Sequence, residues 1–163
     1  PHKLTILTCL LLPSAVLLIL GDVVSANVAD LVDQLRSTDC DASMRKRSLE
    51  RSHQEAQRLY AGCLEQSLPS HNLTMSRAME LFRLQDCEEF EEAYHHHEED
   101  WDYLWMLEEE YQCTGWCSVG RPLWTFKDTS DSCSVVVSQV FANKVLRMAR
   151  QTESLSIFVL LGS

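Results

Sequence analysis

The sequence predicts a mainly α-helical protein with a transmembrane helix, a disulfide-stapled extracellular helical loop and the start of a second transmembrane helix. Three observations predict this class: a long apolar run opens the chain, six cysteines lie in its polar middle, and apolar residues return at its end. Between the two apolar runs, apolar side chains recur at the spacing of a helix. The 163 residues suffice for one domain with a hydrophobic core.

The first segment, residues 1–26, is expected to be a transmembrane helix. Its apolar run from Leu4 to Leu20 and a little beyond approaches the ~20 residues that cross ~30 Å of hydrocarbon. Lys3 precedes the run and places this end in the cytosol. The small residues at 24–26 also fit a cleaved secretory signal peptide, so that alternative stays open. Both alternatives place residues 27–153 in a lumenal or extracellular space.

The cysteines support an oxidising compartment. Six of the seven lie in the polar region and predict three disulfides: Cys40, Cys63, Cys87, Cys113, Cys117 and Cys133. Because Cys113 and Cys117 are close together across a turn, we expect each to join a different distant cysteine, with Cys133 and Cys87 favoured. Reduced, buried cysteines are the alternative. The triplet that starts at Asn72 is an N-glycosylation acceptor, which agrees with a lumenal location.

Several helices are expected in the first half of the loop. One continues from the span, on an apolar stripe that includes Val28, Leu31, Val32 and Leu35. The second has the stripe Leu49, His53, Ala56, Tyr60 and Leu64, and the basic residues 45–47 before it are expected on a solvated face. Residues 68–72 contain Pro and Asn and predict a break, after which Thr74 or Ser76 can cap a third helix.

The stretch from Cys87 to Tyr111 predicts a long amphipathic helix. It holds eleven acidic residues, no Lys or Arg, and aromatic side chains at roughly helical spacing. We expect the aromatic stripe to pack into the core of the loop, with a specific aromatic binding surface as the alternative. The adjacent histidines at 95–97 point in different directions from a helix, which predicts a solvated surface and no metal site.

Charge and motifs limit the classes of function. The net charge of −10 argues against nucleic acid as a partner. No phosphate-binding loop, nucleophile elbow or dinucleotide fingerprint is present in the sequence. We therefore expect a binding module and not an enzyme, with no cofactor, no metal and no small-molecule substrate.

The segment Cys113-Thr114-Gly115-Trp116-Cys117 is the most specific motif. It follows the aromatic and acidic helix, and Gly115 supplies a position that can take positive φ in a turn. A Pro-Leu-Trp-x-Phe segment, Cys133, a final helix and the terminal apolar run at 154–163 come after it. In this order of elements the chain resembles a tetraspanin from its third span to the start of its fourth, in the divergent form found in protists. The adjacent Cys-Cys-Gly of animal members is missing.

The resemblance implies a membrane organiser that binds other membrane proteins laterally through its loop and spans, in the bilayer of the plasma membrane or an endomembrane. The chain would then be part of a longer protein. The resemblance also implies S-acylation of cysteines near the cytosolic ends of spans, for which Cys9 is the candidate. Two alternatives remain: a secreted, helical, disulfide-rich binding protein, and an anchored accessory subunit of a membrane complex.

Overall fold

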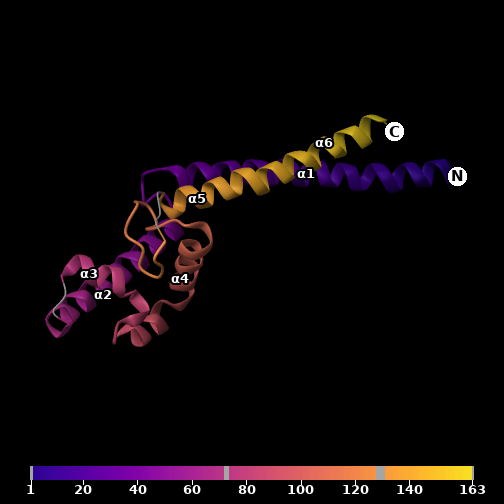
Figure 1. Cartoon of the computed structure of the whole chain (residues 1–163). Coiled ribbons are helices and arrows are strands. Elements are labelled where there is room, and N and C mark those ends of the chain that lie inside the picture. Colours follow the sequence, from indigo (N-terminus) through magenta and orange to yellow (C-terminus); the bar gives the residue numbers. More distant parts are fainter. Residues whose placement is uncertain (1, 72–73, 128–130, 163) are drawn as a thin grey trace. The chain divides into compact units, whose positions relative to one another are not determined.

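The structure is a computed structural model that describes residues 2–71, 74–127 and 131–162 (Figure 1). These residues are mainly helical and contain no strand, as the sequence predicts. The six α-helices are α1 (His2–Arg36), α2 (Met44–His71), α3 (Met75–Leu81), α4 (Phe90–Tyr111), α5 (Cys133–Val140) and α6 (Arg147–Gly162). A short 3-10 helix, η1 (Leu84–Asp86), precedes α4, and a π-helical segment, η2 (Phe141–Leu146), joins α5 to α6.

The chain forms two compact units, which we name by their content. The helix pair consists of residues 1–36 and 137–163, and the stapled domain consists of residues 37–136. The first unit extends to Arg36, because α1 continues without a break from the apolar run through the stripe at Val28, Val32 and Leu35. The expected segments 1–26, 27–153 and 154–163 are defined by a membrane and stay a prediction.

In the helix pair, α1 and α6 lie side by side and antiparallel, so that the two chain ends are at the same end of the pair (Figure 1). Among the described residues, α1 is the one helix long and apolar enough to cross a membrane, and a signal sequence would meet the same criterion. Gly21 is buried where α1 meets α6: a Cβ added there would lie 2.7 Å from Cγ of Glu153. Nearby, the Ser25 hydroxyl donates to Oε1 of Glu153 at 2.6 Å.

In the stapled domain, α2 packs against α3 and α4. The predicted stripe of α2 is buried, as its members show: Leu49, His53, Ala56, Tyr60 and Leu64. On α4, Trp101 is buried and its indole Nε1–H donates to the carbonyl of Ser52 on α2 at 3.0 Å. The packing of α4 aromatics into the domain's own core is therefore confirmed for Trp101 and for Phe90, which is also buried.

Two details differ from expectation. The break predicted at residues 68–72 is absent at 68–71, because α2 continues through Pro69 to His71. A proline in a helix removes one backbone hydrogen bond and crowds the carbonyl four residues before it, but Pro69 lies in the last turn of this helix. Lys46 is buried and not solvated: its ammonium group donates to the carbonyl of Ser37. Desolvation lowers the pKa of Lys46, and the charges of Asp39 and Glu50 oppose the shift.

Candidate partner-binding loop

Three disulfides staple the domain. They join Cys40 to Cys117, Cys63 to Cys87, and Cys113 to Cys133, with Cα–Cα distances of 6.0, 5.6 and 4.9 Å. The six predicted cysteines are thus all paired, and Cys113 and Cys117 join different distant cysteines, as expected. Of the two favoured partners, Cys133 is bonded to Cys113, but Cys87 is bonded to neither, so that part of the prediction is wrong. Cys87 follows η1, where it faces Cys63 on α2.

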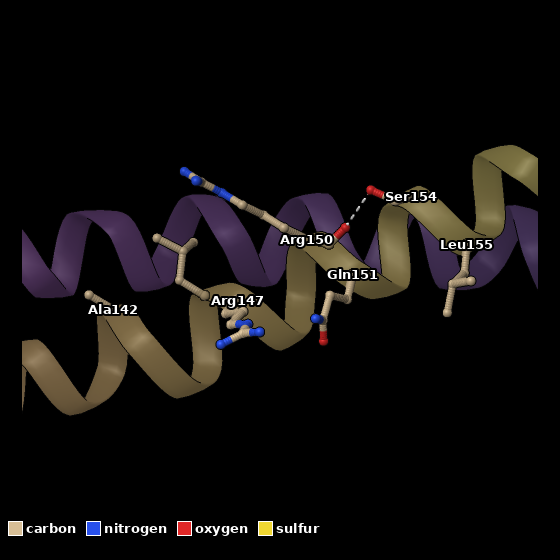
Figure 2. Close-up of a pocket in the computed structure, with 7 residues that line it drawn as sticks. Ala142, Arg147, Arg150, Gln151, Ser154 and Leu155 are labelled. Carbon is tan, nitrogen blue, oxygen red and sulfur yellow. Dashed lines mark hydrogen bonds between the residues drawn. The ribbon is translucent and has the colours of Figure 1, made fainter.

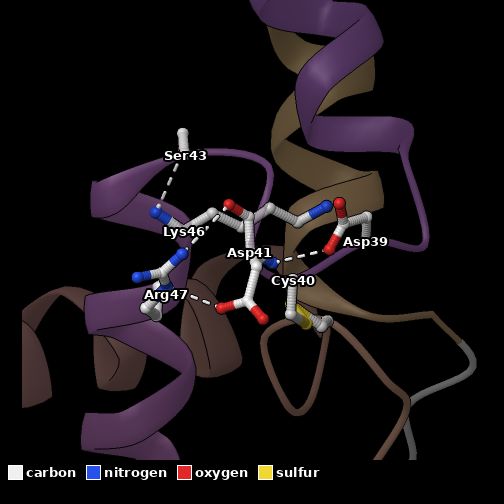
Figure 3. Close-up of polar contacts among 7 residues, drawn as sticks. Asp39, Cys40, Asp41, Ser43, Lys46 and Arg47 are labelled. Carbon is white, nitrogen blue, oxygen red and sulfur yellow. Dashed lines mark hydrogen bonds and ion pairs between the residues drawn. A yellow bond between two sulfur atoms is a disulfide. The ribbon is translucent and has the colours of Figure 1, made fainter.

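Cys117 pairs with Cys40 beside the start of α2 (Figure 3). The backbone N–H of Cys117 donates to Oε2 of Glu50 at 3.0 Å, which fixes the turn against α2. The carboxylate of Glu50 and the two sulfurs lie within 4.8 Å of one another. Metal binding by cysteine requires a thiolate, and these sulfurs are bonded to each other. The group is therefore a structural staple in the oxidised protein.

The short segment around Cys40 is ordered by the acidic side chains of Asp39 and Asp41, which flank it. The N–H of Asp41 donates to Oδ1 of Asp39 at 2.9 Å, and the guanidinium of Arg47 lies 2.6 Å from Oδ1 of Asp41 (Figure 3). The last two side chains are largely exposed, so this ion pair contributes little stability, on the order of 0–1 kcal/mol. It positions the connection between α1 and α2.

The turn between Cys113 and Cys117 depends on Gly115. Its φ is +66°, and an added Cβ would lie 2.0 Å from the carbonyl oxygen of Ser118. Thr114 is buried beside it, and its hydroxyl donates to the carbonyl of Gly120 at 2.9 Å. The predicted positive φ at Gly115 is confirmed. The helix before the turn ends on a second left-handed residue, Gln112, which the sequence did not reveal.

The same turn pairs with the segment that leads into α5. The N–H of Thr114 donates to the carbonyl of Asp131 at 3.1 Å. In the other direction, the N–H of Cys133 donates to the carbonyl of Gly115 at 3.1 Å, and that of Ser134 donates to the carbonyl of Trp116 at 3.0 Å. These bonds run beside the disulfide between Cys113 and Cys133. Covalent and hydrogen bonds thus hold the same two segments together.

Glu108 is buried in the domain, although it is one of the eleven acidic residues in the predicted amphipathic helix. Its side chain is 1% exposed. Oε2 accepts the N–H of Leu123 at 3.1 Å, and Oε1 accepts the N–H of Trp124 at 3.0 Å. Oε1 also accepts the N–H and the hydroxyl of Thr125, at 2.7 and 3.0 Å. One carboxylate of α4 therefore binds three successive residues of the segment after the turn.

Burial raises the pKa of Glu108, and the bonds from Leu123, Thr125 and Trp124 oppose that rise. The indole nitrogens of Trp116 and Trp124 are buried and have no hydrogen-bond partner in the described part of the chain. The core around the turn therefore contains buried polar groups besides Glu108 and its donors, including the Thr114 hydroxyl and the side chain of Ser134.

The histidines of α4 do not converge on one point. His95 and His96 are exposed, and the His97 ring stacks on Trp101 at 5.2 Å. Tyr94 is half-buried, and its hydroxyl donates to Oδ1 of Asp102 at 2.7 Å, which raises the pKa of Tyr94 to about 12. This face of α4 is an acidic surface with partly covered aromatic rings.

Two predicted modification sites lie outside what the structure describes. Asn72 is not among the described residues. Cys9 lies in α1, and its side chain is likewise outside the description. Glycosylation and S-acylation therefore stay predictions.

Sequence reasoning missed two adjoining cavities on the stapled domain, of about 290 and 270 Å³. They share Tyr60, Met79 and Arg121, and Arg83 lines the first. Of these residues only Tyr60 belongs to a predicted apolar stripe, and no single pattern marks the set, because its members come from α2, α3 and irregular segments.

A larger hollow of about 590 Å³ runs along η2 and α6 in the helix pair (Figure 2). Ala142, Arg147, Arg150 and Leu155 are among the residues that line it, and the Ser154 hydroxyl donates to the carbonyl of Arg150 at 2.9 Å. The hollow is a shallow helix face with mixed polarity.

No family model, no curated protein and no solved structure matches this chain.

Proposed function

We propose that this protein is a tetraspanin-like membrane organiser, which binds neighbouring membrane proteins through its disulfide-bonded loop outside the cytosol. One observation carries the proposal: α1 and α6 form an antiparallel pair, and the stapled domain is the sequence between them. A domain inserted between two paired helices is what a loop between one span and the start of the next requires. Three disulfides in that domain support an extracellular or lumenal location.

The surface of the helix pair supports a lipid environment. Large apolar side chains are exposed on both helices, among them Leu12, Ile19, Leu20, Met148, Leu155, Phe158 and Leu161. Exposed apolar surface costs about 25 cal/mol per Å² in water and nothing comparable in hydrocarbon. Many exposed large apolar side chains on one helix pair agree with a membrane or a protein partner.

The contact between the two helices has the character of membrane helix packing. Gly21 lets α1 approach the backbone of α6 at Ala149, and small residues at such contacts are typical of membrane helices. Glu153 turns its carboxylate toward Ser25 on the other helix. Cleavage after Ala26 would remove both Gly21 and Ser25 from this contact. The packing therefore favours a span that is kept over a signal peptide that is removed.

The stapled domain is suited to binding. Disulfides and the Glu108 carboxylate fix its irregular segments in place, and a pre-organised surface loses less entropy when a partner binds. In the helix pair, the hollow along α6 offers a second surface, which a neighbouring membrane helix can cover (Figure 2).

The test is expression of the full chain in microsomes, followed by alkaline carbonate extraction and mass measurement. We expect the uncleaved chain in the membrane pellet, with the stapled domain protected from added protease. A chain cut after Ala26 and released into the lumen would instead make this a secreted binding protein.

Photo-crosslinking in native membranes then separates an organiser from a fixed subunit. A photoreactive residue at exposed Phe158 should crosslink several membrane proteins in substoichiometric amounts, whereas at buried Ser156 it should crosslink few. A single partner at constant stoichiometry would contradict the organiser and identify an accessory subunit.

A further inference from the structure

The two adjoining cavities of the stapled domain combine positive charge with apolar surface. The first, of about 290 Å³, is lined by Tyr60, Ser76, Met79, Glu80, Arg83, Arg121 and Pro122. The second, of about 270 Å³, is lined by Gln57, Tyr60, Ala61, Leu64, Glu65, Met75, Met79, Arg121 and Leu123. Because Tyr60, Met79 and Arg121 belong to both, the cavities form one groove with a cationic end and a mainly apolar end, which also includes Gln57 and Glu65.

Arg83 lies at the cationic end of the groove. Its side chain is only 7% exposed, so its positive charge is largely removed from water. One guanidinium nitrogen, Nη1, donates to the carbonyls of Met79 and Phe82 at 2.8 and 2.7 Å. The guanidinium carbon lies 3.2 Å from the ring centroid of Phe126. Its Nε is buried and has no hydrogen-bond partner among the described residues. The partners of Arg83 are therefore neutral groups.

Arg121 adds a second guanidinium to the same cavity, and this one is exposed. Its Nη1 is directed at the thioether sulfur of Met79, which is a weak acceptor. Within the described ranges, neither arginine lies within ion-pair distance of a carboxylate. Two guanidinium groups without a carboxylate partner stand out in a chain with a net charge of −10.

Two acidic groups lie near this end of the groove, and both are occupied. Glu80 lines the cavity, and its Oε2 lies 2.6 Å from Nη1 of Arg77. Asp86 accepts the backbone N–H of Arg83 at 2.7 Å and not its guanidinium. Neither acid satisfies the two guanidinium groups. A partly desolvated positive charge that lacks a counter-ion favours the binding of an anion.

The geometry points to a partner of specific chemistry. We propose that the groove binds an acidic side chain, Asp or Glu, carried on an apolar segment of a partner protein. The planar carboxylate matches the donor fork of a guanidinium, with the Ser76 hydroxyl at the same wall. The apolar neighbour of that carboxylate occupies the end lined by Leu64, Met75 and Leu123. This inference rests on the proposed function, since it names the partner chemistry of the same loop.

The experiment uses the full chain in nanodiscs, with the disulfides intact and the arginines labelled with ¹⁵N. The probes are acetyl-Leu-Glu-Leu-amide and its neutral match, acetyl-Leu-Gln-Leu-amide. We expect the acidic peptide to shift the Nε–Hε resonances of Arg83 and Arg121 saturably, and to bind about 10-fold or more tightly than the neutral peptide, because charge-assisted bonds are the stronger ones.

A matched pair of variants localises the binding. Arg121→Gln should weaken the acidic peptide about 10-fold. Arg58→Gln should leave it unchanged, because Arg58 is an exposed arginine of α2 that pairs with Glu55 at 2.6 Å and lies outside the groove. Equal binding of the two peptides, or an Arg121→Gln variant that binds like the parent, would overturn the proposal.

Two further probes distinguish other anions. If sodium sulfate binds as tightly as the acidic peptide, the groove is an anion site without a peptide partner. If octanoate binds as tightly as the acidic peptide, the groove is a fatty-acid site. Either result overturns the partner-protein proposal. Carbonate extraction is independent of all these measurements. A chain that stays in the membrane and binds no acidic peptide refutes this inference alone, whereas a released chain that binds it refutes the proposed function alone.

Discussion

Glu108 and Thr125 are joined twice, since Oε1 of the glutamate accepts both the backbone N–H and the hydroxyl of the threonine, at 2.7 and 3.0 Å. Glu108 is on α4, whereas Thr125 belongs to an irregular segment that follows the Cys113–Cys117 turn. A backbone segment without secondary structure must satisfy its N–H groups elsewhere when it is buried. Here a side-chain carboxylate takes the place of a neighbouring strand.

Replacing that carboxylate should therefore loosen the segment. Glu108→Gln removes the charge and places an amide group among four donors. We expect the free energy of unfolding to fall by about 2–3 kcal/mol, the range for hydrogen bonds to a buried charged group. Urea unfolding of the full chain in micelles, followed by tryptophan fluorescence, measures the change.

The neighbouring residue provides the control for this variant. The side chain of Glu109 is exposed, so Glu109→Gln should change the free energy of unfolding by less than about 0.5 kcal/mol. If the two variants had the same free energy of unfolding, the buried hydrogen bonds of Glu108 would make no net contribution to stability.

The spacing of residues in the sequence indicates that Glu108 is buried, whereas the acidic composition of the stretch suggests that it is exposed. Trp101, Leu104 and Glu108 fall at i, i+3 and i+7, so the glutamate lies on the buried face of α4. Eleven acidic residues in the same stretch made it look like one more solvated carboxylate. The helical spacing of the residues on α4 indicates which of its side chains are buried better than the acidic composition of the stretch does. Helical spacing also predicted the buried face of α2, where propensity and packing agree.

The turn at Gly115 offers a second prediction with a built-in control. Gly115→Ala places a Cβ 2.0 Å from a backbone oxygen at a positive φ, so the turn must move. We expect a loss of more than about 2 kcal/mol in the free energy of unfolding. Thermal unfolding of the oxidised chain gives the measurement.

Gly62→Ala should act in the opposite direction. Gly62 lies within α2, and an added Cβ meets nothing within 4 Å. Alanine in a helix interior is favoured over glycine by about 0.8–1.0 kcal/mol. If both alanine variants were destabilised to the same extent, backbone conformation would not explain the need for Gly115.

The disulfide pairing is the third prediction. Non-reducing peptide mapping should recover the pairs Cys40–Cys117, Cys63–Cys87 and Cys113–Cys133. Replacing both Cys40 and Cys117 by alanine opens the longest loop, with a sequence separation of 77, and should cost about 4–5 kcal/mol on chain entropy alone. A peptide that joins Cys117 to Cys87 would contradict this connectivity.

This pairing also shows where sequence reasoning stops. Spacing indicated that Cys113 and Cys117 must have different partners, because a tight turn separates them. The choice between Cys40 and Cys87 for Cys117 depends on which face of α2 the turn meets. That is a tertiary contact, fixed here by the bond from Cys117 to Glu50, and no local pattern encodes it.

Stability should also fall in mild acid because of His53. Burial lowers the pKa of His53 below its usual 6.5, and the charge of Glu50 only partly opposes this. The unfolded chain then binds more protons than the folded one below about pH 6.5, so the free energy of unfolding decreases as pH falls from 6.5 through the folded pKa. Nε2 of the buried ring has no hydrogen-bond partner in the part that the structure describes.

Denaturation curves between pH 7.5 and 5 test the role of this histidine. His53→Gln should flatten the decrease in stability over that range. His96→Gln should leave the decrease in place, because His96 is exposed. A parent protein whose stability is constant over this range would mean that His53 keeps its ordinary pKa.

The contact at Gly21 gives the last prediction. Gly21→Leu adds a side chain where even a Cβ would lie 2.7 Å from Glu153 and 3.5 Å from the carbonyl of Ala149. Overpacking of a tight contact costs about 1–3 kcal/mol. Ala26→Leu adds similar bulk on an exposed face of the same helix and should be neutral. The thermal midpoint of the full chain in nanodiscs should therefore decrease for Gly21→Leu alone. Equal midpoints for the two variants would mean that the helices do not pack through Gly21, and the packing argument for a retained span would lose its support.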